Sequence, residues 1–174
     1  MIADIGLVGL PNAGKSSLIN ELTAAASRVG DYAFTTLEPN LGAYYGLIIA
    51  DIPGLIEGAS EGKGLGVKFL KHIERTKTLF HLVSAESDNV ARDYEVIRGE
   101  LKKYNPKLLE KKEFVFLSKA DVVSPEEVQE KLAALSAGSG SSSGGKKIEA
   151  LPISVIDADS LNKVRNILNE IKDS

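Results

Sequence analysis

Continuous apolar runs alternate with helix-like segments along most of this chain. The apolar runs predict strands at 2–8, 40–45, 47–51, 78–84, 114–117 and 151–154. The helical patterns predict helices near 15–26, 67–76, 90–104, 125–136 and 160–172. Strands that alternate with helices in this way indicate an α/β fold in three layers, in which helices cover both faces of a mostly parallel six-stranded sheet. We expect one antiparallel strand at the edge of that sheet.

Composition and charge fit a globular domain and argue against several classes of function. The 174 residues match one domain of ordinary size, and 43% hydrophobic residues beside 26% charged residues can supply a core. A net charge of −3 argues against a domain that binds nucleic acid through its overall charge. The chain contains no cysteine, which excludes disulfides and thiolate metal sites.

Targeting signals and a membrane span are not expected. No apolar run approaches the roughly 20 residues that cross a bilayer, and no basic residue precedes the first apolar run. These observations predict a cytoplasmic protein. We interpret residues 1–174 as one domain, with a flexible loop or linker at about 137–147, where the segment SGSSSGG is of low complexity.

The segment GLPNAGKS, from Gly9 to Ser16, matches the pattern G-x-x-x-x-G-K-S/T directly after a predicted strand and at the start of a predicted helix. Its glycines allow the backbone to curl so that N–H groups face an anion, and the helix adds its positive N-terminal end. Lys15 is expected against the β- and γ-phosphates of a nucleotide, and the Ser16 hydroxyl against Mg²⁺. The segment therefore predicts a phosphate-binding loop, or P-loop.

Two further segments carry candidate magnesium and phosphate ligands. Asp51 ends an apolar strand and opens the segment DIPG, so its carboxylate can hold Mg²⁺ through a water molecule, and the Gly54 N–H can meet a γ-phosphate. Thr35 and Thr36 lie between the first predicted helix and the second strand. A hydroxyl there can complete the magnesium shell only when the γ-phosphate is present, which is how a switch loop becomes ordered.

Residues that follow the last two strands are candidates for base recognition. The segment SKAD places Asp121 after the strand FVFL, where a carboxylate can accept hydrogen bonds from the guanine N1–H and exocyclic amine. Adenine lacks that pair of donors, so Asp121 is expected to select guanine. The stem of Lys119 can pack along the ring face. Ser154 and Val155 end the last strand, where a backbone N–H can reach the guanine O6.

Three stretches carry a resemblance to a known family: ADIGLVGLPNAGKSSLIN, YAFTTLEPNLG and ADIPGLIEGASEGKGLGVKFLKHIERT. They resemble the Obg family of GTPases, within the TRAFAC class of P-loop GTPases, and the likeness runs from about residue 2 to residue 121. The resemblance implies a G-domain fold in which Thr36 is the magnesium ligand of switch I. It makes Asp51–Gly54 the start of switch II and Asp121 the residue that reads guanine. It also implies that the flanking domains of the family are absent from this chain.

The same resemblance implies a GTP-binding switch that slowly hydrolyses GTP to GDP and phosphate with Mg²⁺ and that takes part in assembly of the large ribosomal subunit. Its partners would be GTP, GDP and the large subunit or its RNA, and the G domain alone would be monomeric. Catalytic roles would fall to Lys15, Gly54 and Thr36. Asn12 would either hold a K⁺ ion, as in related GTPases, or only shape the loop. The implied nucleotide-binding residues are Gly9, Pro11, Asn12, Ala13, Gly14, Lys15, Ser16, Ser17, Phe34, Thr35, Thr36, Asp51, Gly54, Ser118, Lys119, Asp121, Ser154 and Val155.

Departures from the family pattern leave alternatives open. Ser118 replaces the asparagine that ties the base loop to the P-loop, so weaker guanine binding is expected, and Val155 replaces an alanine in a tight turn. Leu55 stands where Ras-like enzymes have a glutamine that orients the attacking water, so hydrolysis is expected to be slow. One alternative is an Obg-like ATPase, against which Asp121 argues. The other is a nucleotide-dependent binding module with negligible hydrolysis.

Overall fold

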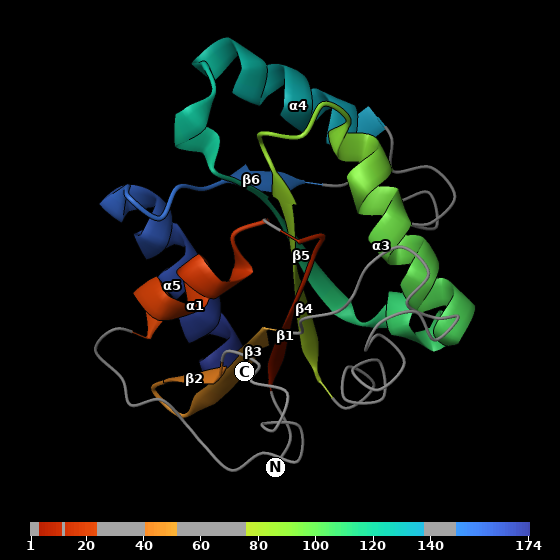
Figure 1. Cartoon of the computed structure of the whole chain (residues 1–174). Coiled ribbons are helices and arrows are strands. Elements are labelled where there is room, and N and C mark those ends of the chain that lie inside the picture. Colours follow the sequence, from red (N-terminus) through yellow and green to blue (C-terminus); the bar gives the residue numbers. More distant parts are fainter. Residues whose placement is uncertain (1–3, 12, 24–40, 52–75, 138–148) are drawn as a thin grey trace.

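The computed structural model describes residues 4–11, 13–23, 41–51, 76–137 and 149–174 (Figure 1). Its strands are β1 (Ile5–Val8), β2 (Leu41–Tyr44), β3 (Leu47–Asp51), β4 (Thr78–Ser84), β5 (Lys112–Ser118) and β6 (Ala150–Pro152). Its α-helices are α1 (Lys15–Leu22), α3 (Val90–Tyr104), α4 (Pro125–Ala137) and α5 (Ala158–Asp173). Two short 3-10 helices, η3 (Pro106–Glu110) and η4 (Ala120–Val122), flank β5.

The strands form one six-stranded sheet in the order β2-β3-β1-β4-β5-β6. Every neighbouring pair is parallel except β2 and β3. Tyr45 and Gly46 join these two strands with φ angles of 45° and 94°, and two positive φ angles are what a tight two-residue hairpin requires. The predicted fold class, with its single antiparallel edge strand, is confirmed within the part of the chain that the structure describes.

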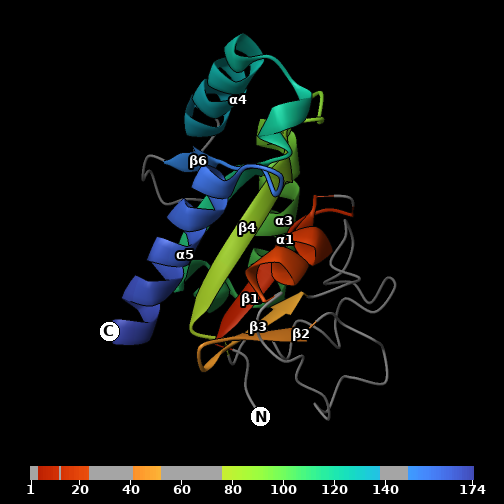
Figure 2. The same ribbon diagram turned by 90° about the vertical axis from the view of Figure 1, so that its left-hand side faces the viewer.

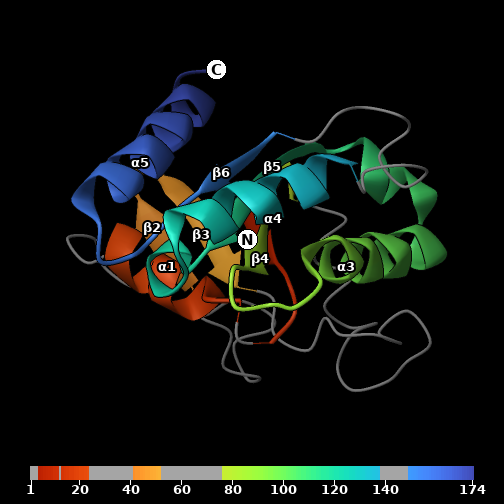
Figure 3. The same cartoon turned by 90° about the horizontal axis from the view of Figure 1, so that it is seen from above.

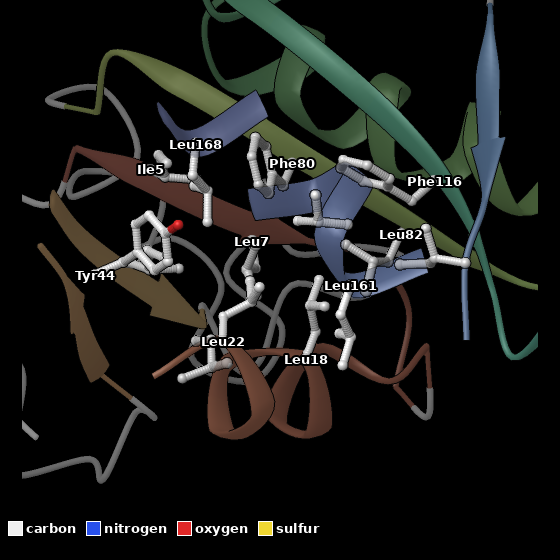
Figure 4. Packing of buried hydrophobic residues seen from close by; sticks show 14 of the residues in the cluster. Ile5, Leu7, Leu18, Leu22, Tyr44, Phe80, Leu82, Phe116, Leu161 and Leu168 are labelled. Atoms are coloured by element: carbon white, nitrogen blue, oxygen red, sulfur yellow. The ribbon is translucent and has the colours of Figure 1, made fainter. Parts of the chain in front are cut away.

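Helices cover both faces of the sheet, as the view from above shows (Figure 3). Helices α1 and α5 pack on one face, which is turned toward the viewer in Figure 2, and α3 and α4 pack on the other. Along β4 the side chains alternate between these faces, so that Phe80 and Leu82 join the first core and Val83 joins the second. In the first core, the β1 side chain of Leu7 lies above Leu18 of α1 (Figure 4).

The observed elements differ from the predicted ones mainly at their ends. The apolar run predicted that β5 begins at 114, because the two preceding residues, Lys112 and Glu113, are polar. In the structure β5 begins at Lys112, since both residues still pair with β4. The two 3-10 helices have no apolar periodicity and were not predicted. The helix expected near 67–76 and the loop expected at 137–147 lie outside the described residues, except for Ala137 and the edge residue Thr76.

Candidate nucleotide-binding site

The P-loop leaves β1 and turns directly into α1. Gly14 is the N-cap of α1 and has φ 90° and ψ 17°, a left-handed conformation that a residue with a side chain rarely adopts. The carbonyl oxygen of Gly14 accepts a hydrogen bond from the Leu18 N–H at 3.0 Å, and the Leu10 carbonyl accepts one from the Ala13 N–H at 3.2 Å. These bonds stabilise a tight turn before α1. The N-terminal end of α1 is therefore next to the loop.

Gly9 at the start of the P-loop allows close contact with the neighbouring strand. A Cβ atom built on Gly9 would lie 2.5 Å from the carbonyl oxygen of Leu82 in β4. Real Cβ atoms do not come this close to backbone oxygen, so only glycine fits without a shift of the backbone. The first glycine of the motif is therefore required by packing against β4, in addition to any contact with a ligand.

Lys15 folds back over the loop. Its Nζ donates a hydrogen bond to the Gly9 carbonyl at 2.9 Å and approaches the Leu10 carbonyl at 3.5 Å. Burial lowers the pKa of Lys15, and the nearby charge of Asp51 opposes that shift. The lysine thus lies on the loop backbone, where a phosphate group would offer its ammonium a stronger acceptor than the two carbonyls.

Ser16 and Asp51 meet beside the P-loop because β1 and β3 are neighbouring parallel strands, with Leu7 opposite Asp51. The Ser16 hydroxyl donates to Asp51 Oδ2 at 2.8 Å. Asp51 is buried, and its Oδ1 has no hydrogen-bond partner within the described ranges. Burial raises the pKa of Asp51, while Lys15 and the Ser16 hydroxyl oppose that shift.

This pair fits a magnesium ion chemically. Mg²⁺ prefers oxygen ligands and usually binds through only one or two protein side chains together with water and substrate phosphates. Ser16 supplies a hydroxyl oxygen, and Asp51 supplies a carboxylate, one oxygen of which has no partner among the described residues. Among the residues that the structure describes, no group of three or more His, Cys, Asp or Glu side chains that could hold a metal ion occurs.

The loop after β5 is tied to the P-loop by Ser118. The buried Ser118 hydroxyl donates to the Ala13 carbonyl at 2.5 Å and lies 3.3 Å from the Val83 carbonyl. From the sequence we expect weaker guanine binding, because Ser118 replaces the asparagine that makes this link in the family. In the structure the shorter hydroxyl still reaches the P-loop backbone, and the weaker guanine binding stays a prediction.

Four of the five residues predicted at the base end, all except Ser154, line one cavity. It is bounded by the P-loop and α1 on one side and by the loops after β5 and β6 on the other. Its lining residues are Gly14, Ser17, Leu18, Leu82, Ser118, Lys119, Asp121, Ile153 and Val155. The structure therefore brings the predicted base residues Lys119, Asp121 and Val155 to the P-loop residues Gly14 and Ser17.

The turn after β6 forms with valine in place of alanine. The Asp157 N–H donates to the Ser154 carbonyl at 3.1 Å, and the Ile156 N–H donates to the Ser154 hydroxyl at 3.3 Å. Val155 sits in this turn half-buried, with its side chain packed at the margin of the first core. The turn therefore forms with Val155 in place of the alanine of the family pattern.

Some predicted site residues lie elsewhere or cannot be placed. Pro11 is exposed and faces a separate cavity of about 330 Å³, whose wall includes Ser84, Glu86 and Asp93. The predicted site residues Asn12, Phe34, Thr35, Thr36 and Gly54, and also Leu55, lie outside the described residues.

Glu86 is a neighbour of the site that the sequence did not suggest. Its Oε1 accepts a hydrogen bond from Lys119 Nζ at 2.8 Å. The two residues are 33 positions apart, and each lies in a loop without periodicity. No local pattern signals such a pair, and only the adjacency of β4 and β5 could have suggested it.

A buried polar cluster lies beneath α3 on the opposite face of the sheet from α1. His81 of β4 is fully buried, stacks on Tyr94 with ring centroids 4.8 Å apart, and has its Nδ1 3.4 Å from Glu113 Oε2. Glu113 also accepts hydrogen bonds from the Tyr94 hydroxyl at 3.1 Å and from Arg98 Nη1 at 3.3 Å. His81 is thus a core residue whose Nε2 has no hydrogen-bond partner among the described residues.

Comparisons with known proteins agree with the geometry of a nucleotide-binding site. The family model described as 50S ribosome-binding GTPase matches residues 4–119. A protein named GTPase Obg from Rickettsia bellii is 46% identical over 178 residues, which cover 99% of this chain and 52% of that protein. A GTPase Obg from Cytophaga hutchinsonii is 52% identical over 131 residues, which cover 72% of this chain and 39% of that protein. The chain thus spans about half or less of the length of these relatives.

A similar fold is found in solved structures. A crystal structure of an Aquifex aeolicus Era variant bound to GDP·AlF4⁻ matches with a TM-score of 0.64 at 22% identity, covering 97% of this chain and 55% of that one. At this identity the likeness shows the fold alone. Among the described residues, no helix has the length and apolar character needed to cross a membrane. The matched family model and the relatives together show that the chain belongs to the family of 50S ribosome-binding GTPases and is of the Obg type.

Proposed function

We propose that this chain binds GTP and GDP and acts as a nucleotide-dependent switch that slowly hydrolyses GTP to GDP and phosphate. The observation that carries this proposal is the single cavity in which Gly14 and Ser17 of the P-loop face Lys119 and Asp121. Gly14 and Ser17 belong to the segment expected to hold the phosphates, and Lys119 and Asp121 belong to the segment expected to hold the base. Family membership supports the same function.

The phosphate end is supported by a lysine, a hydroxyl and a carboxylate in contact. Lys15 would exchange its carbonyl partners for the β- and γ-phosphate oxygens, and its ammonium would neutralise charge that builds up on the leaving β-phosphate oxygen. Ser16 would bind Mg²⁺ directly and Asp51 would do so through water. The ion, when bound, would supply positive charge that offsets the negative charge of the phosphates.

Hydrolysis requires attack of water in line on the γ-phosphorus, with release of GDP. We assign Thr36 and Gly54 to the γ-phosphate by family resemblance, as the hydroxyl ligand of Mg²⁺ and as a backbone N–H donor. None of the assigned residues is a general base, and Leu55 cannot orient water as a glutamine does. Slow turnover is the expected result.

The base end is supported by the position of Asp121 at the rim of the cavity. Its carboxylate would accept hydrogen bonds from the guanine N1–H and amine, the Lys119 stem would cover one ring face, and the turn at Ser154 and Val155 would offer an N–H to O6. The same carboxylate argues against the ATPase alternative, because adenine presents no matching pair of donors.

Partners and cell compartment follow from the family rather than from the site. The description of the matched family supports the large ribosomal subunit, or its RNA, as the macromolecular partner. We also propose a cytoplasmic location and a monomeric G domain. Asn12 is proposed to bind a K⁺ ion, and that ion would take the place of an arginine at the γ-phosphate.

Exchange of the base tests the guanine assignment. We expect the wild-type chain to bind GDP in strong preference to ADP. We expect Asp121→Asn to shift this preference from guanine toward xanthine nucleotides, because the amide offers a donor where xanthine has a carbonyl. Equal binding of GDP and ADP by the wild type, or an unchanged preference in the variant, would refute the assignment.

Leu55 supports a second candidate, a binding module with negligible hydrolysis. Single-turnover hydrolysis of GTP with and without K⁺ separates the two functions. A measurable rate that increases with K⁺ supports a competent enzyme and the role of Asn12. A rate that stays at the uncatalysed level under both conditions supports the binding module.

A further inference from the structure

We propose that Glu86 is a positioning residue of the guanine site, which holds Lys119 so that its methylene stem lies along the wall of the base cavity. This inference rests on the proposed guanine function. It adds a residue from the loop between β4 and α3 that no sequence motif includes. The carboxylate would act through Lys119 and would not touch the base itself.

The backbone of Lys119 is fixed in a conformation that directs its side chain. Its φ of 58° and ψ of 34° are left-handed, which is uncommon for a residue other than glycine. The Val122 N–H donates to the Lys119 carbonyl at 3.1 Å, and the neighbouring Ala120 N–H donates to the Ile153 carbonyl at 3.0 Å. The loop after β5 is thereby tied to the loop after β6, and the side chain starts from a defined point.

The Lys119 side chain runs past the P-loop to reach Glu86. Its Cε lies 3.9 Å from the position that a Cβ on Gly14 would occupy. Its Nζ then meets Glu86 Oε1 at 2.8 Å. The methylene groups thus lie between the backbone of Lys119 and the carboxylate of Glu86. Lys119 and Asp121 both line the base cavity.

Glu86 is itself placed by a small frame of hydrogen bonds around the buried Ala85. The Ala85 N–H donates to the Ser118 carbonyl at 2.8 Å, and the Ala85 carbonyl accepts a short hydrogen bond from Lys131 Nζ of α4. The Glu86 N–H donates to the Ser84 hydroxyl at 3.1 Å. These hydrogen bonds therefore position the backbone of Glu86 and also the C-terminal end of β5, which Lys119 directly follows.

The physical advantage of this arrangement is preorganisation. A free lysine side chain samples many rotamers, and ordering it against a base costs conformational entropy. Where an ion pair already restricts the stem in the free protein, part of this cost is met before the nucleotide arrives. The pair is partly exposed, with 33% of the Lys119 side chain and 56% of the Glu86 side chain accessible, so its effect should be small and sensitive to salt.

The test measures the affinity of Glu86→Gln for GDP and for inorganic triphosphate, a probe without a base. We expect GDP affinity to fall roughly two- to fivefold at low ionic strength, with a smaller difference at high salt, and triphosphate affinity to stay unchanged. In a Lys119→Met background, which keeps the stem and removes the charge, Glu86→Gln should have no further effect. The matched control is Asp88→Asn, which removes a charge from an exposed residue of the same loop.

Four results would overturn the inference. They are an unchanged GDP affinity in Glu86→Gln, an equal loss in the Lys119→Met background, an equal loss for triphosphate, and an equal loss in Asp88→Asn. The last two would indicate a general effect of charge on the phosphates. Failure of the guanine function itself looks different, because GDP and ADP would then bind equally to the wild type.

Discussion

The hydroxyl of Ser118 lies 2.5 Å from the carbonyl oxygen of Ala13 and donates a hydrogen bond to it across 105 residues of chain. This bond fixes the distance between the loop proposed to read the base and the loop proposed to hold the phosphates. This distance matters because a nucleotide spans only a limited range of lengths between its base and its β-phosphate. The bond therefore connects the two halves of the proposed nucleotide site.

Removal of this bond should weaken nucleotide binding more than it changes the fold. In Ser118→Ala the buried Ala13 carbonyl loses its partner, and leaving such a group unsatisfied costs about 1–3 kcal/mol in the free energy of unfolding. We expect GDP affinity to fall in addition, while Ser118→Asn, which restores an amide donor, should bind GDP at least as tightly as the wild type. Chemical denaturation and GDP titration measure both effects. Equal GDP affinity in the alanine variant would contradict the role of the bond.

Asp51→Asn should separate magnesium binding from stability. We expect the part of GTP affinity that depends on Mg²⁺ to fall by roughly 10–100-fold, the range found when a group that orients metal-bound ligands is lost. The nucleotide-free protein should not lose stability at neutral pH. Burial raises the pKa of Asp51 above its ordinary 3.8, so the ionised carboxylate is a cost to the folded state that asparagine removes.

Titration of GTP with and without Mg²⁺, together with denaturation of the free protein, checks this prediction. The sign of the pH effect follows from the raised pKa of Asp51. Its contribution to stability is largest below the unfolded pKa and declines as pH rises through the folded pKa. If Mg²⁺ increases GTP affinity by the same factor in Asp51→Asn and in the wild type, Asp51 does not take part in magnesium binding.

Gly9→Ala should destabilise the chain by about 1–3 kcal/mol, the usual cost of forcing an extra methyl group into a packed region. The new Cβ would lie 2.5 Å from the Leu82 carbonyl oxygen, so the P-loop or β4 must move. The matched control is Gly99→Ala in α3, where, among the described residues and apart from the local helix backbone, the new Cβ meets no heavy atom within 4 Å. That helical position should gain roughly 0.5–1 kcal/mol. Similar denaturation midpoints for the two variants would show that the close approach at Gly9 carries no cost.

Glu113 should govern part of the stability at acid pH. Burial acts to raise the pKa of Glu113, but the hydrogen bonds and charges of His81, Arg98 and Tyr94 outweigh burial and lower this pKa below 4.5. A lowered folded pKa means that the stabilisation is complete above the unfolded pKa and is lost as pH falls through the folded pKa. We expect Glu113→Gln to cost roughly 1.5–3 kcal/mol at neutral pH, as loss of hydrogen bonds to a charged group does.

Denaturation at several pH values measures this effect. The wild type should lose stability steeply as pH falls below 4.5, whereas Glu113→Gln should show a shallower decline. Glu110→Gln, with the same change of charge at an exposed residue of η3, should resemble the wild type. Parallel curves for the wild type and Glu113→Gln would show that other groups control acid stability.

Much of the fold could be predicted because apolar periodicity is a local property. The alternation of strands and helices gave the three layers, and the short link at Tyr45 and Gly46 agrees with an antiparallel edge strand. The P-loop could be predicted from its own sequence because Gly9, Gly14 and Lys15 lie within one short segment of the chain. The link from Ser118 to Ala13 and the pair of Glu86 with Lys119 escaped detection, because each joins loops brought together only by the order of the strands.

The strand order also bears on synthesis of the chain. The elements proposed to hold phosphate and Mg²⁺, namely β1, α1 and β3, are complete by Asp51, whereas Asp121 and Val155 follow β5 and β6. Chains are made from the N-terminus, so a nascent chain that has not yet reached β5 would hold the residues proposed for phosphate binding without those proposed to distinguish guanine from adenine. We therefore expect base selectivity to be acquired late, when β5 and then β6 are added to the sheet beyond β4.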